Sequence, residues 1–360
     1  MTNCEPSKEN AEESHDHLWQ SELKSALRSP QQASEFFNVD FPHTPYSIFI
    51  PLKFAHKIKE QGMNGPLAKQ FLPHADEMSE LQNQGFYDPI GDSKFARGGQ
   101  LIHRYTNRVL FTPTTACPIH CRYCFRKNEL NQRDRIFDAD FATTLTYLRA
   151  HPEIEELIFT GGDPLMLGEQ RLDFYFNEFS QISHLKFIRI HSRMPIIIPS
   201  RITASFGSLL AKYSSRFTIH LSLHINHVSE WCKALETNIE NFIPRTVHLL
   251  AQTVLLKGLN DTRQSLLALF QLLHSKNIRP YYLHHPDLVK GGMHFWLSLE
   301  EGQTLYRELK MNAPGWLLPQ YVLDTPHGGG KINAWSTAHN SKGVITDIHG
   351  NNQNYPQILH

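Results

Sequence analysis

Three of the five cysteines in this chain of 360 residues lie within eight positions of one another. They are Cys117, Cys121 and Cys124 in the stretch TTACPIHCRYCFRK, so their spacing is Cys-x3-Cys-x2-Cys. An odd, clustered set is a poor disulfide framework and is more typical of metal or redox chemistry in a reducing compartment. Three thiolates also leave a fourth ligand position for some other group.

Zinc and an iron–sulfur cluster are the two interpretations of this spacing. A structural zinc site normally uses two cysteine pairs, and no second pair follows here, since Cys232 stands alone. Zinc held by three cysteines and one of the 22 histidines remains an alternative. The favoured interpretation is a [4Fe–4S] cluster with three protein ligands. Its fourth iron would then accept a substrate or cosubstrate.

A glycine-rich turn follows a second apolar run. In FTGGDP, the residues Gly161, Gly162, Asp163 and Pro164 come directly after LIFT. Bare glycines let the backbone approach a ligand closely. GGDP by itself is also an ordinary turn sequence, so its significance depends on its place behind the cysteines.

A lysine after three glycines suggests a further cofactor. In the stretch LDTPHGGGKINAW, Lys331 directly follows the three glycines, and the spacing of a P-loop is absent. It predicts either a surface turn with a solvated lysine or a lysine that forms a Schiff base with pyridoxal phosphate. Arg104, Tyr105 and Arg108 precede the first strand and suit a phosphate and a planar ring, although they could also be surface residues.

The elements that must position these residues alternate between strands and helices. Runs rich in β-branched and aromatic residues occur at 109–114, 157–162, 187–192, 217–223, 248–256 and 279–285, with helical periodicity between them. This alternation predicts an α/β fold, an incomplete (β/α)6 TIM-like barrel, with a doubly wound open sheet as the alternative. The barrel predicts that chemistry lies after each strand, on the C-terminal face.

The chain divides into three expected parts. Residues 1–100 are an N-terminal helical extension, 101–290 the partial barrel, and 291–360 a C-terminal segment that carries Lys331. Basic and acidic residues balance at 35 each, which gives no electrostatic footprint for nucleic acid or an anionic membrane. No secretory signal or membrane span is predicted, so we expect a cytoplasmic protein.

Several blocks together resemble the lysine 2,3-aminomutase family of the radical S-adenosylmethionine superfamily. They are HRYTNRVLF, CPIHCRYCFRK, FTGGDPL, RIHSRMPIIIPSRIT, HPDLVKGGMHF and LDTPHGGGK, in that order over roughly residues 90–335. The resemblance implies a [4Fe–4S] cluster, S-adenosylmethionine and pyridoxal phosphate. It also implies that GGDP binds the methionyl amino group and that Lys331 is the Schiff-base lysine.

The same resemblance implies a substrate site and a reaction, the conversion of L-α-lysine to β-lysine by 2,3-amino migration. Arg126 would bind the α-carboxylate, as a guanidinium does well. Asp287 and Asp324 would hold the distal ammonium and repel an acidic side chain, although each could be an ordinary turn or cap residue. His191, Ser192 and Arg193, at the end of the third strand, are candidate adenosine or phosphate contacts.

Some features leave the physiological role open. The chain has no cysteine after Cys232, so it lacks the C-terminal zinc set of many family members, and only a possible homo-oligomer is expected. Short relatives supply β-lysine to elongation factor P, and another amino acid substrate is a further alternative. Flavodoxin or ferredoxin is the expected electron donor. Competing hypotheses are a radical enzyme without pyridoxal phosphate, an iron–sulfur electron carrier or sensor, and a zinc scaffold.

Overall fold

The computed structural model describes residues 17–98, 100–128, 141–325, 329–335, 344–346 and 352–354. Within them, nine strands form one main sheet, whose spatial order is the order of the strands in the chain. These strands are β1 (Leu101–Tyr105), β2 (Arg108–Thr114), β3 (Glu156–Gly161), β4 (Phe187–Ser192), β5 (Thr218–His224), β6 (His248–Val254), β7 (Arg279–His284), β8 (Gln320–Thr325) and β9 (Gly330–Asn333). A separate antiparallel pair is formed by β10 (Val344–Thr346) and β11 (Asn352–Asn354).

Strands β2 to β8 run parallel, and β1 and β9 add antiparallel edges. Sequential order without a reversal confirms the partial-barrel prediction, while a doubly wound sheet would need a switch point in the strand order. Two details differ from expectation. Strand β8 extends the parallel sheet beyond the predicted units, and Arg104 and Tyr105 lie on β1 because a tight turn joins β1 to β2.

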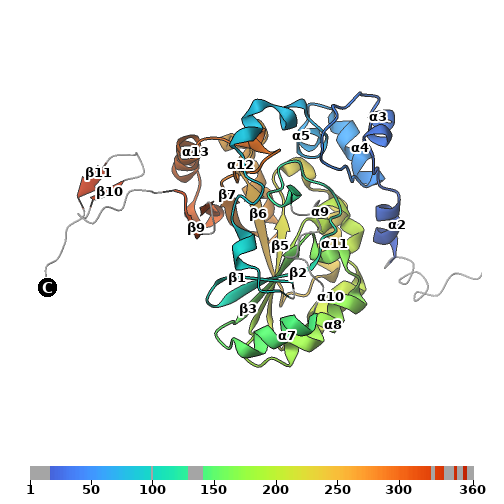
Figure 1. The fold of residues 1–360 in the computed structure, drawn as a ribbon, viewed down its shortest axis with the longest axis vertical. Helices are drawn as coiled ribbons and strands as arrows, with labels where there is room; N and C mark the ends of the chain where they lie inside the picture. The colour runs from blue at the N-terminus through green and yellow to red at the C-terminus, as the bar shows by residue number, and fades with distance from the viewer. Residues whose placement is uncertain are drawn as a thin grey trace, which may run out of the picture.

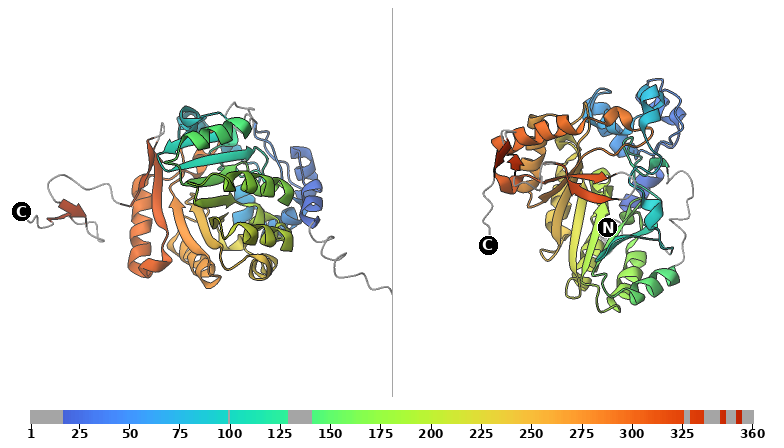
Figure 2. Two further views of the ribbon diagram at one scale, coloured as in Figure 1. Left: turned by 90° about the horizontal axis from the view of Figure 1, so that it is seen from below. Right: turned by 60° about the vertical axis from the view of Figure 1, so that its left-hand side comes forward.

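Helices cover the outside of the curved sheet, as Figures 1 and 2 show. The α-helices are α2 (Leu18–Lys24), α3 (Pro30–Phe37), α4 (Leu52–Gln61), α5 (Pro66–Phe71), α7 (Phe141–Ala150), α8 (Glu169–Ser180), α9 (Met194–Ile197), α10 (Ala204–Tyr213), α11 (Lys233–Phe242), α12 (Arg263–Ser275) and α13 (Leu299–Asn312). The 3-10 helices are η1 (Ala75–Met78), η2 (Glu80–Gln84), η3 (Asp92–Phe95), η5 (Pro164–Met166), η6 (Pro199–Arg201), η7 (Val228–Glu230), η8 (Met293–Phe295) and η9 (Gly315–Leu317). None of the helices described is long and apolar enough to cross a membrane.

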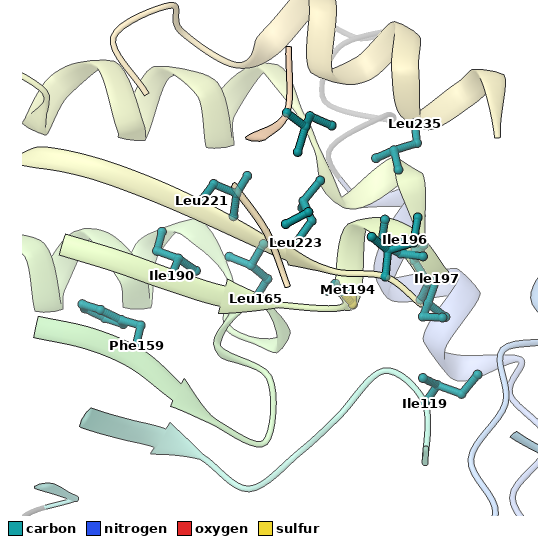
Figure 3. Packing of buried hydrophobic residues seen from close by; sticks show 14 of the residues in the cluster. Ile119, Phe159, Leu165, Ile190, Met194, Ile196, Ile197, Leu221, Leu223 and Leu235 are labelled. Atoms are coloured by element: carbon teal, nitrogen blue, oxygen red, sulfur yellow. The ribbon is translucent and has the colours of Figure 1, made fainter. Parts of the chain in front are cut away.

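Strand alternation separates the hydrophobic core from the interior of the barrel. On β4, Ile188 and Ile190 are fully buried in the core between sheet and helices, whereas Arg189 and His191 line a central cavity. Successive side chains point to opposite faces of a strand, so the register of the strand fixes both the core residues and the cavity-lining residues. Figure 3 shows part of this core, with Phe159, Ile190 and Leu221 on successive strands. The same strands therefore build the core and point polar groups inward.

The N-terminal extension packs on the loops at the C-terminal ends of the strands. Its helices are coloured blue in Figure 1. The backbone N–H of Arg122, in the cysteine loop, donates to the carbonyl of Gln70 at 2.8 Å, and its guanidinium pairs with buried Glu77. The backbone of Phe86 bonds to Leu288 and Lys290 in the loop after β7. The extension thus fixes two of the loops that surround the cavity.

Candidate active site

One cavity of about 680 Å³ opens at the C-terminal ends of the parallel strands. It is lined by every candidate residue predicted above except Pro164, which is the first residue of η5. These lining residues are Arg104, Tyr105, Arg108, Cys117, Cys121, Cys124, Arg126, Gly161, Gly162, Asp163, His191, Ser192, Arg193, Asp287, Asp324 and Lys331. Residues spread over more than 220 positions of sequence thus meet in one place.

The three cysteines lie on the loop after β2. Burial raises the pKa of each thiol, to about 12 for Cys124. Proximity adds to the effect, because Cys124 raises the pKa of Cys117 and Cys121 raises that of Cys124. Within the described ranges, no three His, Cys, Asp or Glu side chains are grouped so as to hold a single metal ion. A [4Fe–4S] cluster is bound differently, with one thiolate on each of three irons.

The GGDP turn braces the cysteine loop. Gly162 N donates to Thr114 O at 2.8 Å, and Asp163 N donates to Ala116 O at 2.7 Å. Gly161 has a φ of +113°, and a Cβ there would come within 2.6 Å of Thr114 O. Both glycines are therefore required by the close approach of two backbones.

The carboxylate of Asp163 joins β3 to the end of β4. It accepts hydrogen bonds from Ser192 Oγ at 2.7 Å and from the backbone N–H groups of Leu165, Arg193 and Met194 at 2.7–3.0 Å. Ser192 and the Arg193 backbone thus have structural partners on the GGDP turn. Burial raises the pKa of Asp163, and its hydrogen bonds oppose that rise.

The Arg193 side chain lies in a buried polar network. Its guanidinium donates to Tyr123 Oη, to Gln70 Oε1 at 2.8 Å and to the carboxylate of Glu230. His191 differs, because its Nε2 is buried and has no hydrogen-bond partner among the described residues. Burial holds the pKa of His191 well below its usual value, so the ring is neutral near pH 7.

Lys331 and Asp324 face each other on neighbouring strands. They are directly paired in the antiparallel register of β8 and β9, and the Lys331 ammonium donates to Asp324 Oδ2. The Lys331 backbone N–H donates to Tyr105 Oη at 2.7 Å, so β1 also holds this strand in place. Gly328, one of the three glycines before the lysine, lies outside the described residues.

Asp287 lies on the loop after β7 and lines the cavity. Its carboxyl is partly buried, and burial followed by the negative charge of Asp324 raises its pKa to about 7. Asp287 and Asp324 are therefore suited to bind a cation. A bound positive charge would offset both the burial of the Asp287 carboxylate and its repulsion by Asp324.

Arg126 and Arg104 share a buried carboxylate, Asp92. Its Oδ2 accepts from Arg126 Nη2 at 2.7 Å, and its Oδ1 accepts from Arg104 Nη2 at 2.8 Å. The Arg104 Nη1 lies 3.9 Å from Asp324 Oδ1. Arg108 instead stacks over the Tyr105 ring, with its guanidinium carbon 3.8 Å from the ring centroid.

Sequence reasoning missed several charged or polar residues of this cavity, among them Asp92, His224 and His284. Asp92 lies in a stretch, DPIGDSKF, that has the composition of a turn and gives no signal of function. No role is assigned to His224 or His284 from the sequence, yet each is the last residue of a parallel strand and lines the cavity. Their strand-end position was the signal that could have identified them. His227 and His285 instead make structural hydrogen bonds, to Ser229 and Tyr321.

The chemistry of these residues fits the three groups implied by the sequence. Three clustered thiols suit an iron–sulfur cluster. The unpartnered Nε2 of His191 leaves a polar contact for a nucleoside ligand. Lys331 suits pyridoxal phosphate, because Arg104, Tyr105 and Arg108 on β1 and β2 line the same cavity.

Comparison with known proteins agrees with an iron–sulfur site. A family model described as "4Fe-4S single cluster domain" matches residues 106–181, which include the three cysteines. The L-lysine 2,3-aminomutase of Buchnera aphidicola subsp. Baizongia pistaciae is 34% identical over 88% of this chain and 95% of that protein. The L-lysine 2,3-aminomutase of Escherichia coli is 33% identical over 84% of this chain and 90% of that protein. The enzyme of that name from Clostridium subterminale is 30% identical over 80% of this chain and 67% of that protein. Identity at this level across most of both chains shows that the protein belongs to the L-lysine 2,3-aminomutase family.

Proposed function

We propose that this protein is a radical S-adenosylmethionine enzyme that converts L-α-lysine to β-lysine by moving the amino group from C2 to C3. The observation that carries the proposal is the convergence of three cysteines, Lys331 and the pair Asp287 and Asp324 on one cavity. The cluster and S-adenosylmethionine together supply a carbon radical for hydrogen abstraction, and pyridoxal phosphate carries the migrating nitrogen.

The residues around the cavity divide between the cofactors. Cys117, Cys121 and Cys124 would hold the cluster, and the GGDP turn with His191 would contact S-adenosylmethionine. Lys331 would bind pyridoxal phosphate through its side-chain nitrogen as the neutral amine, while Arg104, Tyr105 and Arg108 would receive the ring and phosphate. Ser192 and Arg193 would act by fixing the turn and the aromatic side chain of Tyr123, since both are already hydrogen-bonded to protein groups.

The substrate would be held at its two ends. Arg126 would receive the α-carboxylate, and the carboxylates of Asp287 and Asp324 would receive the ε-ammonium. Burial around these groups strengthens each charge pair by excluding water. Fixing both ends would hold the C2–C3 bond in one orientation, which a migration between neighbouring carbons requires.

The test is anaerobic reconstitution followed by turnover. The protein is loaded with iron, sulfide and pyridoxal phosphate, then incubated with S-adenosylmethionine, dithionite and L-lysine, and β-lysine is measured by chromatography. We expect β-lysine from the wild type and none from Cys121→Ala or Lys331→Ala. Lys331→Ala should keep its iron but lose the visible absorbance of bound pyridoxal phosphate, whereas Lys212→Ala, at an exposed ion pair on α10, should change neither.

Each failure of this test has a distinct meaning. Formation of 5′-deoxyadenosine without β-lysine would contradict lysine as the substrate and direct the search to another amino acid. Turnover that survives Lys331→Ala with no bound pyridoxal phosphate would favour a radical reaction without that cofactor. Neither product from a fully loaded protein would favour the electron carrier or sensor.

A second proposal concerns the destination of the product. The chain covers 90–95% of the length of relatives such as those from Escherichia coli and Buchnera aphidicola, which supports grouping it with the short family members. Delivery of β-lysine to elongation factor P is therefore worth testing by mass spectrometry of that factor in cells with and without this protein. An unchanged mass would contradict it. The flavodoxin or ferredoxin donor and the homo-oligomer stay predictions.

A further inference from the structure

A buried carboxylate, Asp92, lies at the junction of three separate segments around the cavity. It begins η3 in the N-terminal extension, while Arg104 comes from β1 and Arg126 from the end of the cysteine loop. The exposed fractions of these three side chains are 1%, 9% and 4%, so all three charges are removed from water. One carboxylate therefore holds two buried guanidiniums, one with each oxygen.

Asp92 is itself fixed by a local framework. Asp88 Oδ1 accepts from Asp92 N at 3.0 Å, and Asp88 Oδ2 accepts from Ser93 N and Ser93 Oγ. The preceding residue, Gly91, has a φ of +69°, which turns the chain sharply into η3. The backbone that carries Asp92 is thus held by contacts within the extension itself.

The ion pairs form a chain of alternating charge across the cavity. It runs from Lys331 to Asp324, then to Arg104 at 3.9 Å, then to Asp92 and finally to Arg126. The chain connects the lysine proposed to bind the cofactor with the arginine proposed to bind the substrate carboxylate.

We propose that Asp92 is a positioning residue that orients Arg126 for the α-carboxylate of the substrate. This inference rests on the proposed function, because it assigns that arginine to the substrate. Asp92 holds Nη2 of Arg126, while Nη1 lies 3.4 Å from Thr160 Oγ1 and from Gly161 O, so the guanidinium plane is fixed on two sides. Without the charge on Asp92, the two buried cations would repel each other and Arg126 would leave this orientation.

The test separates carboxylate recognition from general damage. Reconstituted wild type, Asp92→Asn and Asp92→Glu are compared, with Asp173→Asn, an exposed carboxylate on α8, as the matched control. We expect Asp92→Asn to raise KM for L-lysine about tenfold or more, with a smaller change in kcat, since a buried charge-assisted bond is disrupted. The Ki of L-lysinamide, which keeps both amino groups but lacks the carboxylate charge, should change less than about twofold. Asp92→Glu restores the charge and should recover most of the KM.

Three outcomes would overturn the inference. One is an equal loss of affinity for L-lysine and L-lysinamide, and another is a fall in kcat with KM unchanged. The third is a fall of iron and sulfide content in both Asp92 variants, which would assign Asp92 to supporting the cysteine loop. If the wild type forms no β-lysine, the proposed function fails instead, and titration of the bound cofactor's absorbance with both ligands still tests Asp92.

Discussion

Asp287 is an acidic residue of the cavity whose pKa lies near neutrality. Burial, followed by the charge of Asp324, raises its pKa to about 7, while Lys331 and Arg104 act in the opposite direction. A raised pKa means that the folded protein holds this proton up to about pH 7 and has the carboxylate only above it. The ε-ammonium of lysine stays charged over this range, so its attraction to Asp287 should follow the ionisation of the protein group.

We therefore expect kcat/KM for L-lysine to rise with pH through about 7, because this parameter reports ionisations of the free enzyme. Asp287→Asn should remove that step and lower kcat/KM by about tenfold or more, because a charge-assisted bond is lost. The measurement is the pH profile of kcat/KM for the two proteins, with Asp173→Asn as control. A step that persists in Asp287→Asn would assign the ionisation to another group.

The turn after β3 shows how one element positions another. Gly161 and Gly162 are packed against the backbone of residues 114–116, which leads directly into the first cysteine. A Cβ on Gly162 would overlap the carbonyl oxygen of Ala116 and approach the carbonyl carbon of Thr115. The neighbours are backbone atoms, so no side-chain rotation can relieve the contact, and the cysteine loop itself must move.

Gly162→Ala should therefore lower the iron and sulfide retained after reconstitution to less than about half, because thiolate ligands tolerate little displacement. The matched control is Gly315→Ala at the start of η9, where an added Cβ meets nothing within 4 Å. Iron and sulfide analysis, together with the visible absorbance of the iron–sulfur cluster, measures how much cluster each variant retains. Equal iron content in the two variants would mean that the loop adapts to the turn.

At the scale of the whole molecule, the N-terminal extension is joined to the barrel through a buried ion pair. Arg122 lies between Cys121 and Cys124 in the sequence, and Glu77 comes from η1. The exposed fractions of their side chains are 2% and 0%. Arg122 also donates to Ser47 O and Thr44 Oγ1, so one guanidinium holds several parts of the extension. Removing one partner would leave the other charge buried and uncompensated.

Glu77→Gln should lower the free energy of unfolding by about 3–5 kcal/mol, measured by urea denaturation, because Arg122 keeps its charge without a counterion. Native proteolysis should then cut within residues 44–82 faster than in the wild type. Glu155→Gln breaks an exposed pair with Lys186 and should cost less than about 1 kcal/mol. Similar losses in the two variants would show that burial of the Arg122–Glu77 pair contributes little.

The sequence by itself determined the pattern of strands, the family and most of the candidate site. Alternating β-branched runs and helical stretches predict the parallel strands because the periods of the two structures differ, and residues after such strands converge on one face. The cysteine spacing, the GGDP turn and Lys331 were identified from local signals, since each depends on residue type and short spacing. The extra parallel strand β8 was not predicted, because QYVLDT is short and is buried through contacts with distant strands.

Only the tertiary structure decided which charges meet. Asp324 and Lys331 are seven positions apart in sequence, but their pairing depends on the register of β8 and β9. Asp92 and Arg126 are separated by 34 positions and come together because the extension folds over the cysteine loop. Local propensity contains no information about such pairs, because the free energy of a buried ion pair depends on distance and on water exclusion. Both of these are properties of the folded chain alone.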